Sequence, residues 1–369
     1  MVALQNEFET FAVRKVAPQA GRIDREESLP AELVSEMAGS GFLGSFLPSE
    51  WGGQALDMVD YGILHEEIGR FCSSTRSLLT VHDMVAHAIL KYGSREQRSR
   101  WLPELASGST IAAFAVSEPN VGSDPSAVET TARRVGRGFV LNGVKRWISF
   151  GRIAGLLLVL ARLEGQPEAF LVEARSPGLS IEPIAGLVGL RGSMAAELHF
   201  DDCEIGGDCR LGRPGFGGIL VVLGALGLGR YSVACGCVGI VRACLEASLA
   251  YAAERRQFGK ALREHQLIQA MIAEMSVNLK AARLLCREVG RLKQQRDPSE
   301  IAETFVAKYF ASQAAVKAST DAVQIHGANG CAGGYPVERF WRDARVMEII
   351  EGSSEIQKIT IADHAFREA

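Results

Sequence analysis

The chain has 369 residues, of which 47% are hydrophobic and 22% are charged, and its formal net charge is −3. This length allows several packed layers, and the composition is that of an ordered globular protein rather than a disordered one. The small negative charge and the lack of a basic run give no reason to expect binding to nucleic acid or to an anionic membrane surface.

The first part of the chain, residues 1–112, is predicted to be helical. Near the N-terminus, Phe8, Phe11, Ala12 and Val16 recur at helical spacing, and similar patterns follow further along. Glycine-rich segments between these patterns mark loops. The N-terminus lacks the charged-then-apolar pattern of a signal peptide, so the expected location is the cytoplasm.

Residues 113–212 are predicted to form a β domain. Short apolar or β-branched runs follow one another without an intervening helix, each bounded by turn residues. They cover residues 113–116, 138–143, 156–160, 169–172, 179–183 and 196–200. About six or seven strands of this kind favour a small sandwich or barrel over a doubly wound sheet.

Residues 213–369 are predicted to form a C-terminal helical bundle. A glycine-rich stretch at 212–218 leads into it, and helical patterns cover residues 238–253, 266–292, 300–325 and 357 to the end. The apolar run 217–229 contains glycines and is interpreted as too short to span a bilayer. The expected fold class is therefore α+β, with helices, then strands, then a helical bundle.

The eight cysteines and seven histidines do not form a recognisable metal motif. Cys235 and Cys237 have no second pair at the spacing of a zinc site, so we interpret them as buried small hydrophobes in a reducing cytoplasm. His82 and His87 are five residues apart, which differs from the i, i+4 spacing of ligands on one helix. We predict no metal site.

A helix break near the C-terminus carries the strongest candidate for catalysis. Glu351 follows the apolar pair Ile349 and Ile350 and precedes a glycine. A carboxylate at such a break can face a dry cavity, where burial would raise its pKa toward that of a usable base. Ser354 and Gln357 have the spacing of a capping box, which predicts a new helix. By itself, this pattern also suits a solvated loop.

Five blocks, in this order, resemble the acyl-CoA dehydrogenase superfamily of flavoenzymes. They are residues 115–124 (AVSEPNVGSD), 142–149 (NGVKRWIS), 255–259 (RRQFG), 324–327 (QIHG) and 347–354 (MEIIEGSS). The resemblance implies a three-domain fold in which the middle strands and the last helices hold FAD between them. The last block and residues 235–240 (CGCVGI) also resemble the branch that makes oxygenated malonyl extender units for polyketides on an acyl carrier protein.

The resemblance places the flavin ring at the strand ends of the β domain. Trp147 and Ser149 would flank the ring, and Ser117 and the backbone of Val116 would hydrogen-bond its pyrimidine edge. Ser123 would contact both cofactor and substrate. Considered alone, Trp147 is better interpreted as a core tryptophan.

A second group would reach the FAD of a neighbouring subunit, which implies a homodimer or homotetramer. A guanidinium suits a pyrophosphate, a phenyl ring can lie against an adenine, and a glycine turn allows close backbone approach to phosphate. Considered alone, Arg255 would be interpreted as part of a surface ion pair. The residues implied in this second group are Arg255, Phe258, Gln266, Gln324, Gly327 and Ala328. Ser353 and Glu355, which are close to Glu351 in the sequence, are also implied in cofactor binding but do not belong to this group.

The implied reaction is the oxidation of an acyl thioester across its α and β carbons. Glu351 would remove the α-proton while the β-hydride passes to FAD, and hydrogen bonds to the thioester oxygen would stabilise the enolate. One of these bonds would come from the backbone N–H of Glu351. Arg230 aligns with an arginine of the substrate pocket, and Ser123 and Gly352 are the other expected substrate contacts.

Four positions depart from the pattern of the family. Gly227 replaces an aspartate, Ile350 an aromatic residue, Ala328 a glycine and Glu355 a glutamine. Since the first two positions lie at the substrate pocket, we expect a short, oxygenated acyl group on an acyl carrier protein rather than a fatty acyl chain.

Three alternatives remain open from the sequence. Two share the expected fold: a short-chain acyl-CoA dehydrogenase, and a flavin oxidase or monooxygenase that lets oxygen reach the ring. The third is a non-catalytic protein that holds FAD and binds a partner, although the acidic chain lacks a basic face for nucleic acid. An electron-transfer flavoprotein or another acceptor would take the electrons from a dehydrogenase.

Overall fold

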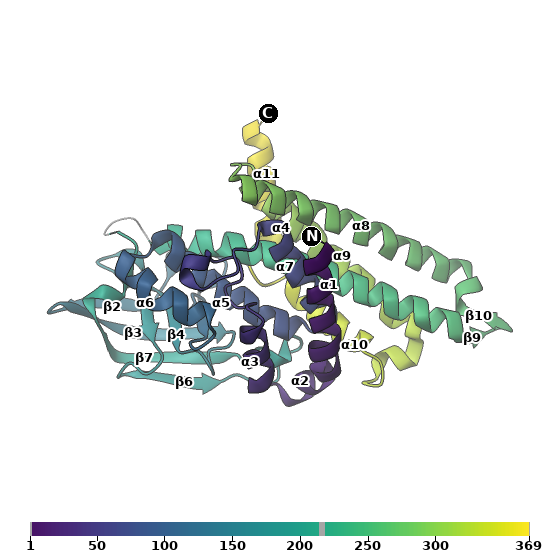
Figure 1. Cartoon of the computed structure of the whole chain (residues 1–369), viewed down its shortest axis with the longest axis horizontal. Coiled ribbons are helices and arrows are strands. Elements are labelled where there is room, and N and C mark those ends of the chain that lie inside the picture. Colours follow the sequence, from purple (N-terminus) through teal and green to yellow (C-terminus); the bar gives the residue numbers. More distant parts are fainter. Residues whose placement is uncertain (1, 214–217, 369) are drawn as a thin grey trace.

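The computed structural model describes residues 2–213 and 218–368. It confirms the α+β fold class, with helices first, strands in the middle and helices again toward the C-terminus (Figure 1). Residues 214–217, inside the predicted glycine-rich stretch, lie outside the described residues.

The N-terminal helices pack into one layer against the later helices and the sheet. A capping box of Ser94 and Gln97 starts α6, and the Asp57 side chain accepts from a backbone N–H to start α4. α4 and α5 are buried over most of their length because they lie between the other N-terminal helices and the C-terminal ones. The helices are α1 (Val2–Phe11), α2 (Ala20–Glu26), α3 (Ala31–Gly39), α4 (Met58–Phe71), α5 (Ser73–Tyr92) and α6 (Arg95–Ala106).

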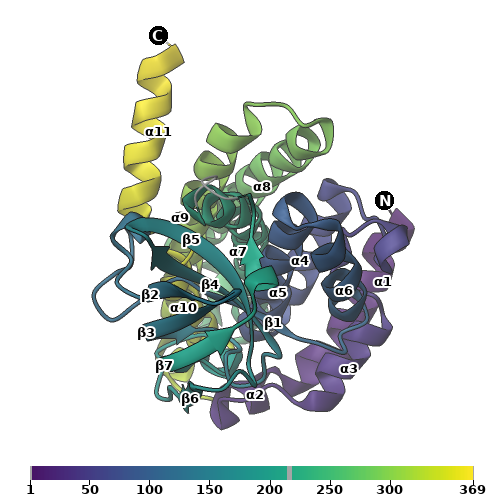
Figure 2. The ribbon, with the colours of Figure 1, turned by 90° about the vertical axis from the view of Figure 1, so that its left-hand side faces the viewer.

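The middle strands form one curved sheet with the order β6-β7-β3-β2-β4-β5-β8, and β1 pairs with β4 (Figure 2). β1 and β2 lie in succession along β4, both parallel to it. The strands are β1 (Ala112–Ala115), β2 (Thr131–Val135), β3 (Gly138–Ile148), β4 (Leu156–Leu163), β5 (Gln166–Glu173), β6 (Leu179–Pro183), β7 (Ala196–Ile205) and β8 (Arg210–Leu211).

Both faces of β4 are buried, because the curved sheet covers one face and helices cover the other. Leu156 and Leu158 pack with the helical side, whereas Leu157 and Val159 pack with β3 and β7. This alternation follows from the two-residue period of a strand. The sheet therefore has a core of its own and also supports α5 and α7.

The C-terminal helices are built around one long helix, α7, which packs against α4, α5, α8 and α9. A short hairpin, β9–β10, joins α7 to α8 at the end of the molecule far from the sheet (Figure 1). α11 projects from the body of the molecule (Figure 2). The elements are α7 (Gly218–Glu254), β9 (Arg256–Gln257), β10 (Lys260–Ala261), α8 (Gln266–Gln295), α9 (Glu300–His326), α10 (Val337–Met347) and α11 (Ser354–Glu368).

α7 is the one helix in the described residues that is long and apolar enough, by length and composition, to cross a membrane. The sequence-based reason against a span, that residues 217–229 are too short a run, is wrong because residues 218–229 are the first part of this 37-residue helix. The most apolar window of α7 is 67% buried inside the protein. Its apolar character is therefore explained by its place at the centre of the helical core.

Candidate active site

Glu351 lies in the turn between α10 and α11, with its backbone in the left-handed region at φ 56°. The next residue, Gly352, also has a positive φ of 91°, so the chain reverses sharply here. Arg230 on α7 donates from Nε to the Glu351 carbonyl at 3.0 Å, and Gln357 donates to the same carbonyl at 3.2 Å. The unusual backbone conformation of Glu351 is thus held by side chains from two helices.

The Glu351 carboxylate rests against Gly229 of α7. A Cβ atom added at Gly229 would lie 2.5 Å from Glu351 Oε2 and 2.6 Å from Met84 Sδ. The residue as a whole is half-buried, but Oε2 is shielded from solvent and has no hydrogen-bond partner in the described part of the chain. A missing side chain at position 229 therefore provides the space in which the carboxylate lies.

Burial raises the pKa of Glu351 to about 7, and the nearby positive charges of Arg230, Lys308 and Arg76 oppose this rise. A carboxyl group with this pKa is a proton acceptor near neutral pH. The predicted burial of the base is therefore what the geometry shows, and the reading of Glu351 as a solvated loop residue does not fit.

The two neighbouring glutamates do not share this environment. Glu348 hydrogen-bonds Gln313 and forms an ion pair with Arg345, and Glu355 is exposed. The predicted capping box of Ser354 and Gln357 is wrong by one residue. The side chain of Ser353 accepts from the Ile356 backbone N–H at 3.5 Å, while Gln357 binds the carbonyls of the turn.

Arg230 and Gly352 are the two residues expected at the substrate, and both lie at this turn: Arg230 contacts it from α7, and Gly352 is part of it. The Arg230 guanidinium lies 4.5 Å above the ring of Phe305 and is buried. The Gly352 carbonyl accepts from Lys308 Nζ at 2.8 Å. These contacts hold the turn in place. They also place Arg230 next to Glu351, where a substrate that reaches the carboxylate would lie.

The strand ends bring together the residues predicted for the flavin ring. Val116 is buried at the end of β1, and the Ser117 carbonyl accepts from the Arg146 N–H at 2.9 Å, which joins this end to β3. Trp147 is 53% exposed and has a φ of 63°. It is therefore no core tryptophan. Ser149 is half-buried two residues on.

A buried ion pair, which is not predicted from the sequence, lies directly behind these residues. Lys145 Nζ lies 2.7 Å from Glu118 Oε1, both side chains are at most 1% exposed, and Lys145 also donates to the Val116 carbonyl at 3.1 Å. Glu118 further accepts from the backbone N–H groups of Glu129 and Thr130. The pair locks the end of β1 to the end of β3, and only its positions inside the two motifs hinted at it.

Ser123 is exposed in the loop after β1, and none of its contacts ties it to Glu351 or to the strand ends. The structure therefore gives its predicted double role no geometric support beyond the proximity in sequence to Ser117.

The second predicted group lies at the opposite end of the molecule from the sheet (Figure 1). A cavity of about 240 Å³ is lined by Arg255, Gly327 and Ala328 among other residues, so the structure brings these three together. Phe258 is 93% exposed at the tip of the β9–β10 hairpin with a φ of 52°. Gln266 and Gln324 are exposed on α8 and α9 and do not line the cavity.

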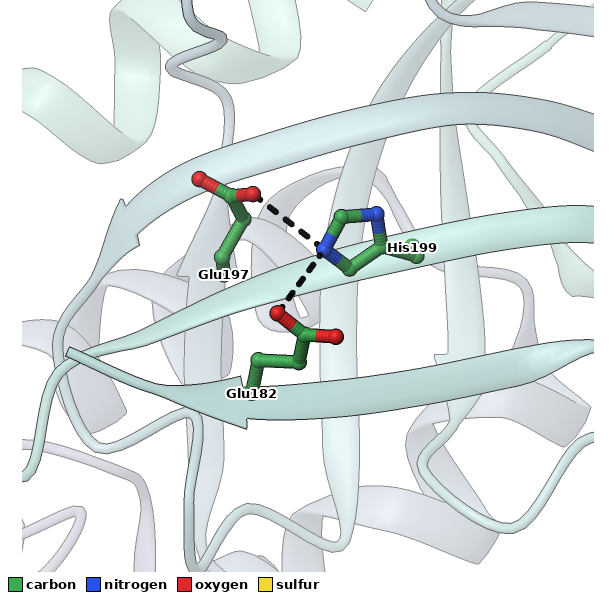
Figure 3. A group of neighbouring side chains, drawn as sticks. All are labelled: Glu182, Glu197 and His199. Carbon is green, nitrogen blue, oxygen red and sulfur yellow. Dashed lines mark ion pairs between the residues drawn. The ribbon is translucent and has the colours of Figure 1, made fainter.

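Three side chains on β6 and β7, Glu182, Glu197 and His199, lie close enough to resemble a metal site (Figure 3). His199 Nε2 is 3.2 Å from Glu197 and 3.6 Å from Glu182, and Glu197 also pairs with Arg146 at 3.1 Å. Since a cation from the chain already occupies Glu197, we interpret the group as an ion-pair cluster on the sheet surface.

Comparison with known proteins follows the same three regions. The family models of the N-terminal, middle and C-terminal domains of acyl-CoA dehydrogenase match residues 2–109, 113–203 and 217–366. This chain belongs to the acyl-CoA dehydrogenase family. The human mitochondrial short-chain specific acyl-CoA dehydrogenase is 40% identical over 97% of this chain and 88% of its own length.

Two solved structures extend the comparison. Glutaryl-CoA dehydrogenase from Mycobacterium smegmatis, in complex with FADH2, is 29% identical with a TM-score of 0.94, covering 98% of this chain and 93% of its own. FkbI, for biosynthesis of the methoxymalonyl extender unit of the Fk520 polyketide, is 33% identical with a TM-score of 0.91, covering 97% of this chain and 99% of its own.

FAD is the cofactor of this acyl-CoA dehydrogenase family member, and the residues present fit it. An exposed tryptophan beside half-buried serines offers a surface and hydrogen bonds for an aromatic ring. The carboxylate of Glu351 has an unpaired buried oxygen, and the cavity at Arg255 offers a guanidinium beside a glycine turn. Val116, Ser117, Trp147 and Ser149 would hold the ring.

Proposed function

We propose that this protein is an FAD-dependent acyl-thioester dehydrogenase in which Glu351 removes the proton from the carbon next to the thioester carbonyl. The observation that carries the proposal is the buried, unpaired Oε2 of Glu351 together with a pKa of about 7. A base of this kind matches the operating pH, so it can accept a carbon-bound proton without being permanently protonated.

The turn that carries the base has a second role in this proposal. Glu351 has a left-handed backbone conformation, so its N–H and its carbonyl point in different directions. The carbonyl accepts hydrogen bonds from Arg230 and Gln357. The N–H is proposed to donate to the thioester oxygen as negative charge develops there. FAD, when bound, supplies the acceptor for the two electrons that leave the β-carbon as a hydride.

For the substrate, we propose a short, oxygenated acyl group on an acyl carrier protein, used in polyketide extender-unit and antibiotic biosynthesis. The similarity to FkbI supports this. Position 227 supports it too, because a Cβ added at Gly227 would meet nothing within 4 Å. The space left by the missing aspartate is open, and the aliphatic Ile350 precedes the base in place of an aromatic ring.

A short-chain acyl-CoA dehydrogenase is the second candidate. The identity of 40% to the human short-chain enzyme over nearly the whole chain favours it. The two candidates share Glu351 and FAD and differ only in the acyl group and its carrier, so a substrate panel separates them.

For partners and location, we propose a homodimer or homotetramer in the cytoplasm, with an electron-transfer flavoprotein or another protein as electron acceptor. We expect no binding to nucleic acid or membrane. The exposed Phe258 and the cavity at Arg255 support an oligomer, since both lie far from the strand ends of their own chain (Figure 1).

The test is an anaerobic titration of the purified yellow protein with butyryl and glyceryl thioesters, each on CoA and on a carrier protein. Bleaching of the visible flavin band names the substrate and its carrier. Glu351→Gln should retain bound FAD and lose bleaching by at least ~1,000-fold, because the remaining amide cannot accept the proton. Bleaching that survives this substitution would show that another group is the base.

The oxidase alternative is separated by mixing the reduced protein with air in a stopped-flow instrument. Reoxidation that is complete within seconds would favour an oxidase or monooxygenase. Slow reoxidation that an added acceptor protein accelerates is the result expected of a dehydrogenase. A protein that binds FAD but bleaches with no thioester would support the non-catalytic reading.

A further inference from the structure

Lys308 on α9 is a buried lysine next to the catalytic turn. Its side chain has no exposed surface, and Nζ donates to the Gly352 carbonyl, directly after Glu351 in the chain, at 2.8 Å. Within the described residues this is its one hydrogen bond, and no carboxylate forms an ion pair with it. A buried ammonium group is normally paired with an anion, because its removal from water is unfavourable. The position of Lys308 therefore needs an explanation.

Two side chains of α9 contact the catalytic turn, and only one of them is charged. Gln313, five residues after Lys308, donates to the Glu348 carboxylate before the turn and to Ser354 Oγ after it, the latter at 3.4 Å. Lys308 donates to the Gly352 carbonyl in the middle of the turn. Neutral donors such as Gln313 are thus sufficient to hold this backbone, so Lys308 adds something that a neutral donor does not: a positive charge.

The charged and titratable groups around Lys308 leave one anion unpaired. Burial lowers the pKa of Lys308 to about 8, so it is mostly protonated at neutral pH. Burial raises the pKa of the Cys237 thiol to about 12, which keeps it neutral, and Glu348 is paired with Arg345. Glu351 has no ion pair in the described part of the chain. The groups that face Lys308 are Cys237 and Arg230 on α7, and Glu348 and Glu351 at the turn.

Glu351 is faced in turn by three cations from three helices. They are Arg76 on α5, Arg230 on α7 and Lys308 on α9. An ammonium group bonded to the carboxylate itself would occupy an oxygen that takes the proton, and it would lower the pKa of the base strongly. Because Lys308 is bonded to the carbonyl of the next residue, it brings its charge near Glu351 and leaves Oε2 without a hydrogen-bond partner.

We propose that Lys308 is a positioning residue for the reaction: its hydrogen bond to Gly352 fixes the turn, and its charge keeps the Glu351 carboxylate ionised and free to take a proton. This rests on the proposed function, which makes Glu351 the base. Arg230 and Gln357 hold the carbonyl of Glu351, and Lys308 holds the carbonyl that follows it. Lys308 acts through Glu351 and not on the substrate.

The experiment titrates the Glu351 carboxyl group in the FAD-loaded oligomer without substrate. The infrared band of its protonated form is identified as the band that Glu351→Gln removes, and it is followed from about pH 5 to about pH 9. The wild type should titrate at about pH 7. Lys308→Met should titrate about 0.5–1 pH unit higher, because a nearby positive charge stabilises the carboxylate. Lys308→Arg keeps the charge and should titrate close to the wild type.

The pH profile of flavin reduction is the second measurement, made anaerobically with the thioester that the substrate panel selects. The rate should rise with pH as Glu351 loses its proton. In Lys308→Met this rise should move to higher pH by the same amount as the infrared titration. The rate at about pH 7 should then fall at least about twofold, because less of the base is ionised.

Gln313→Leu is the matched control, since Gln313 contacts the same turn from the same helix without a charge. Lys293→Met removes a largely buried lysine that is paired with Glu300. Both variants should leave the titration of Glu351 where the wild type has it. If Lys308→Met loses FAD, Lys308→Gln serves instead, because its neutral amide still donates hydrogen bonds. Its titration should move in the same direction.

A Glu351 titration that stays in place in Lys308→Met, or that moves equally in Gln313→Leu, would overturn the proposal even if flavin reduction becomes slower. Lys308 would then hold the turn as any donor could. The dehydrogenase function would stand, since flavin reduction still occurs. A wild type whose flavin no thioester reduces would instead refute the dehydrogenase function, and the infrared titration, which needs no substrate, would still show whether Lys308 controls the ionisation of Glu351.

Discussion

Glu351 shows how a single catalytic side chain opposes the stability of the fold that holds it. Its carboxyl is buried without a hydrogen-bond partner at Oε2, and burial raises its pKa from 4.5 to about 7. The folded state therefore prefers the protonated form. The stability that this group contributes is present below the unfolded pKa and is lost as the pH rises through 7.

Glu351→Gln should therefore become more stable than the wild type as the pH is raised. The amide stays neutral, so the variant avoids the buried charge at about pH 8, where the gain is on the order of 3 kcal/mol. Thermal unfolding of both proteins with FAD bound, at about pH 5 and about pH 8, measures the change. The same Tm difference at both pH values would contradict the burial of the charge.

The pair of Lys145 and Glu118 is the opposite case, a buried charge that has a partner of opposite charge. Burial lowers the pKa of Lys145 to about 8, while Glu118 opposes this shift. Lys145→Met should cost about 3–5 kcal/mol in urea unfolding and weaken FAD retention, since it leaves Glu118 unpaired and frees the Val116 carbonyl. Glu118→Leu added to Lys145→Met should recover part of the stability.

Arg134→Met is the control for the buried pair. Arg134 and Glu164 form an exposed ion pair at 2.9 Å, with side chains 54% and 70% exposed. Its loss should cost less than about 1 kcal/mol and leave FAD bound. Equal effects of the two substitutions would mean that burial does not distinguish the pairs.

Sequence reasoning identified Glu351 because a carboxylate beside a glycine break is a local signal. It did not identify Arg76, because charged residues occur on every amphipathic helix and the sequence does not tell which face is buried. The one signal is its place directly ahead of the apolar residues Leu78 and Leu79. Lys145 is part of a motif in the sequence, but its ion pair is not predictable there, since its partner Glu118 lies 27 residues away.

At the scale of elements, a glycine of α7, Gly229, leaves the space in which the Glu351 carboxylate lies. Gly229→Ala should lower the rate of flavin reduction by thioesters at least ~tenfold, because the new methyl group would meet the Glu351 carboxylate and Met84. Gly227→Ala adds its methyl group to open space on the same helix. It should raise the Tm slightly, as alanine is the better helix residue by roughly 0.5–1 kcal/mol. A Tm gain of the same size in Gly229→Ala would contradict the close packing at that position.

The same glycines lie in a segment for which the sequence predicts helix, as part of the C-terminal bundle, and the structure confirms it. Four glycines lower the helix propensity of residues 218–229, and packing of α7 on four other helices offsets this. β2 is not predicted from the sequence, because four of its five residues are exposed and it lacks a run of apolar side chains. The predicted order of helices, then strands, then helices is confirmed, because hydrophobic periodicity over a long segment is a stronger signal than a few unusual residues within it.

At the scale of the whole molecule, the two groups of predicted FAD residues lie at opposite ends (Figure 1). If Arg255 and Trp147 each bind FAD, the two groups of one chain therefore cannot contact the same FAD molecule. Trp147→Ala and Arg255→Ala should each weaken FAD binding, yet co-expression of the two should form hybrid oligomers with one intact site of two. Flavin content per chain near half that of the wild type in the isolated hybrid, and about a quarter in the unsorted mixture, checks this. No recovery would contradict a shared site.

Phe258 at the hairpin tip is 93% exposed, in a backbone conformation that a bulky residue adopts only at a cost. Among the described residues its one ring contact is the edge-on approach of His265 at 6.2 Å, which leaves the ring largely in solvent. If the adenine end of FAD covers the Phe258 ring, then FAD binding and oligomer formation are thermodynamically linked. Diluting the enzyme should then dissociate the protomers and release FAD, which is measured by its absorbance in an ultrafiltrate. Adding free FAD should favour reassociation of the protomers, so the cofactor would stabilise the oligomer in addition to accepting electrons.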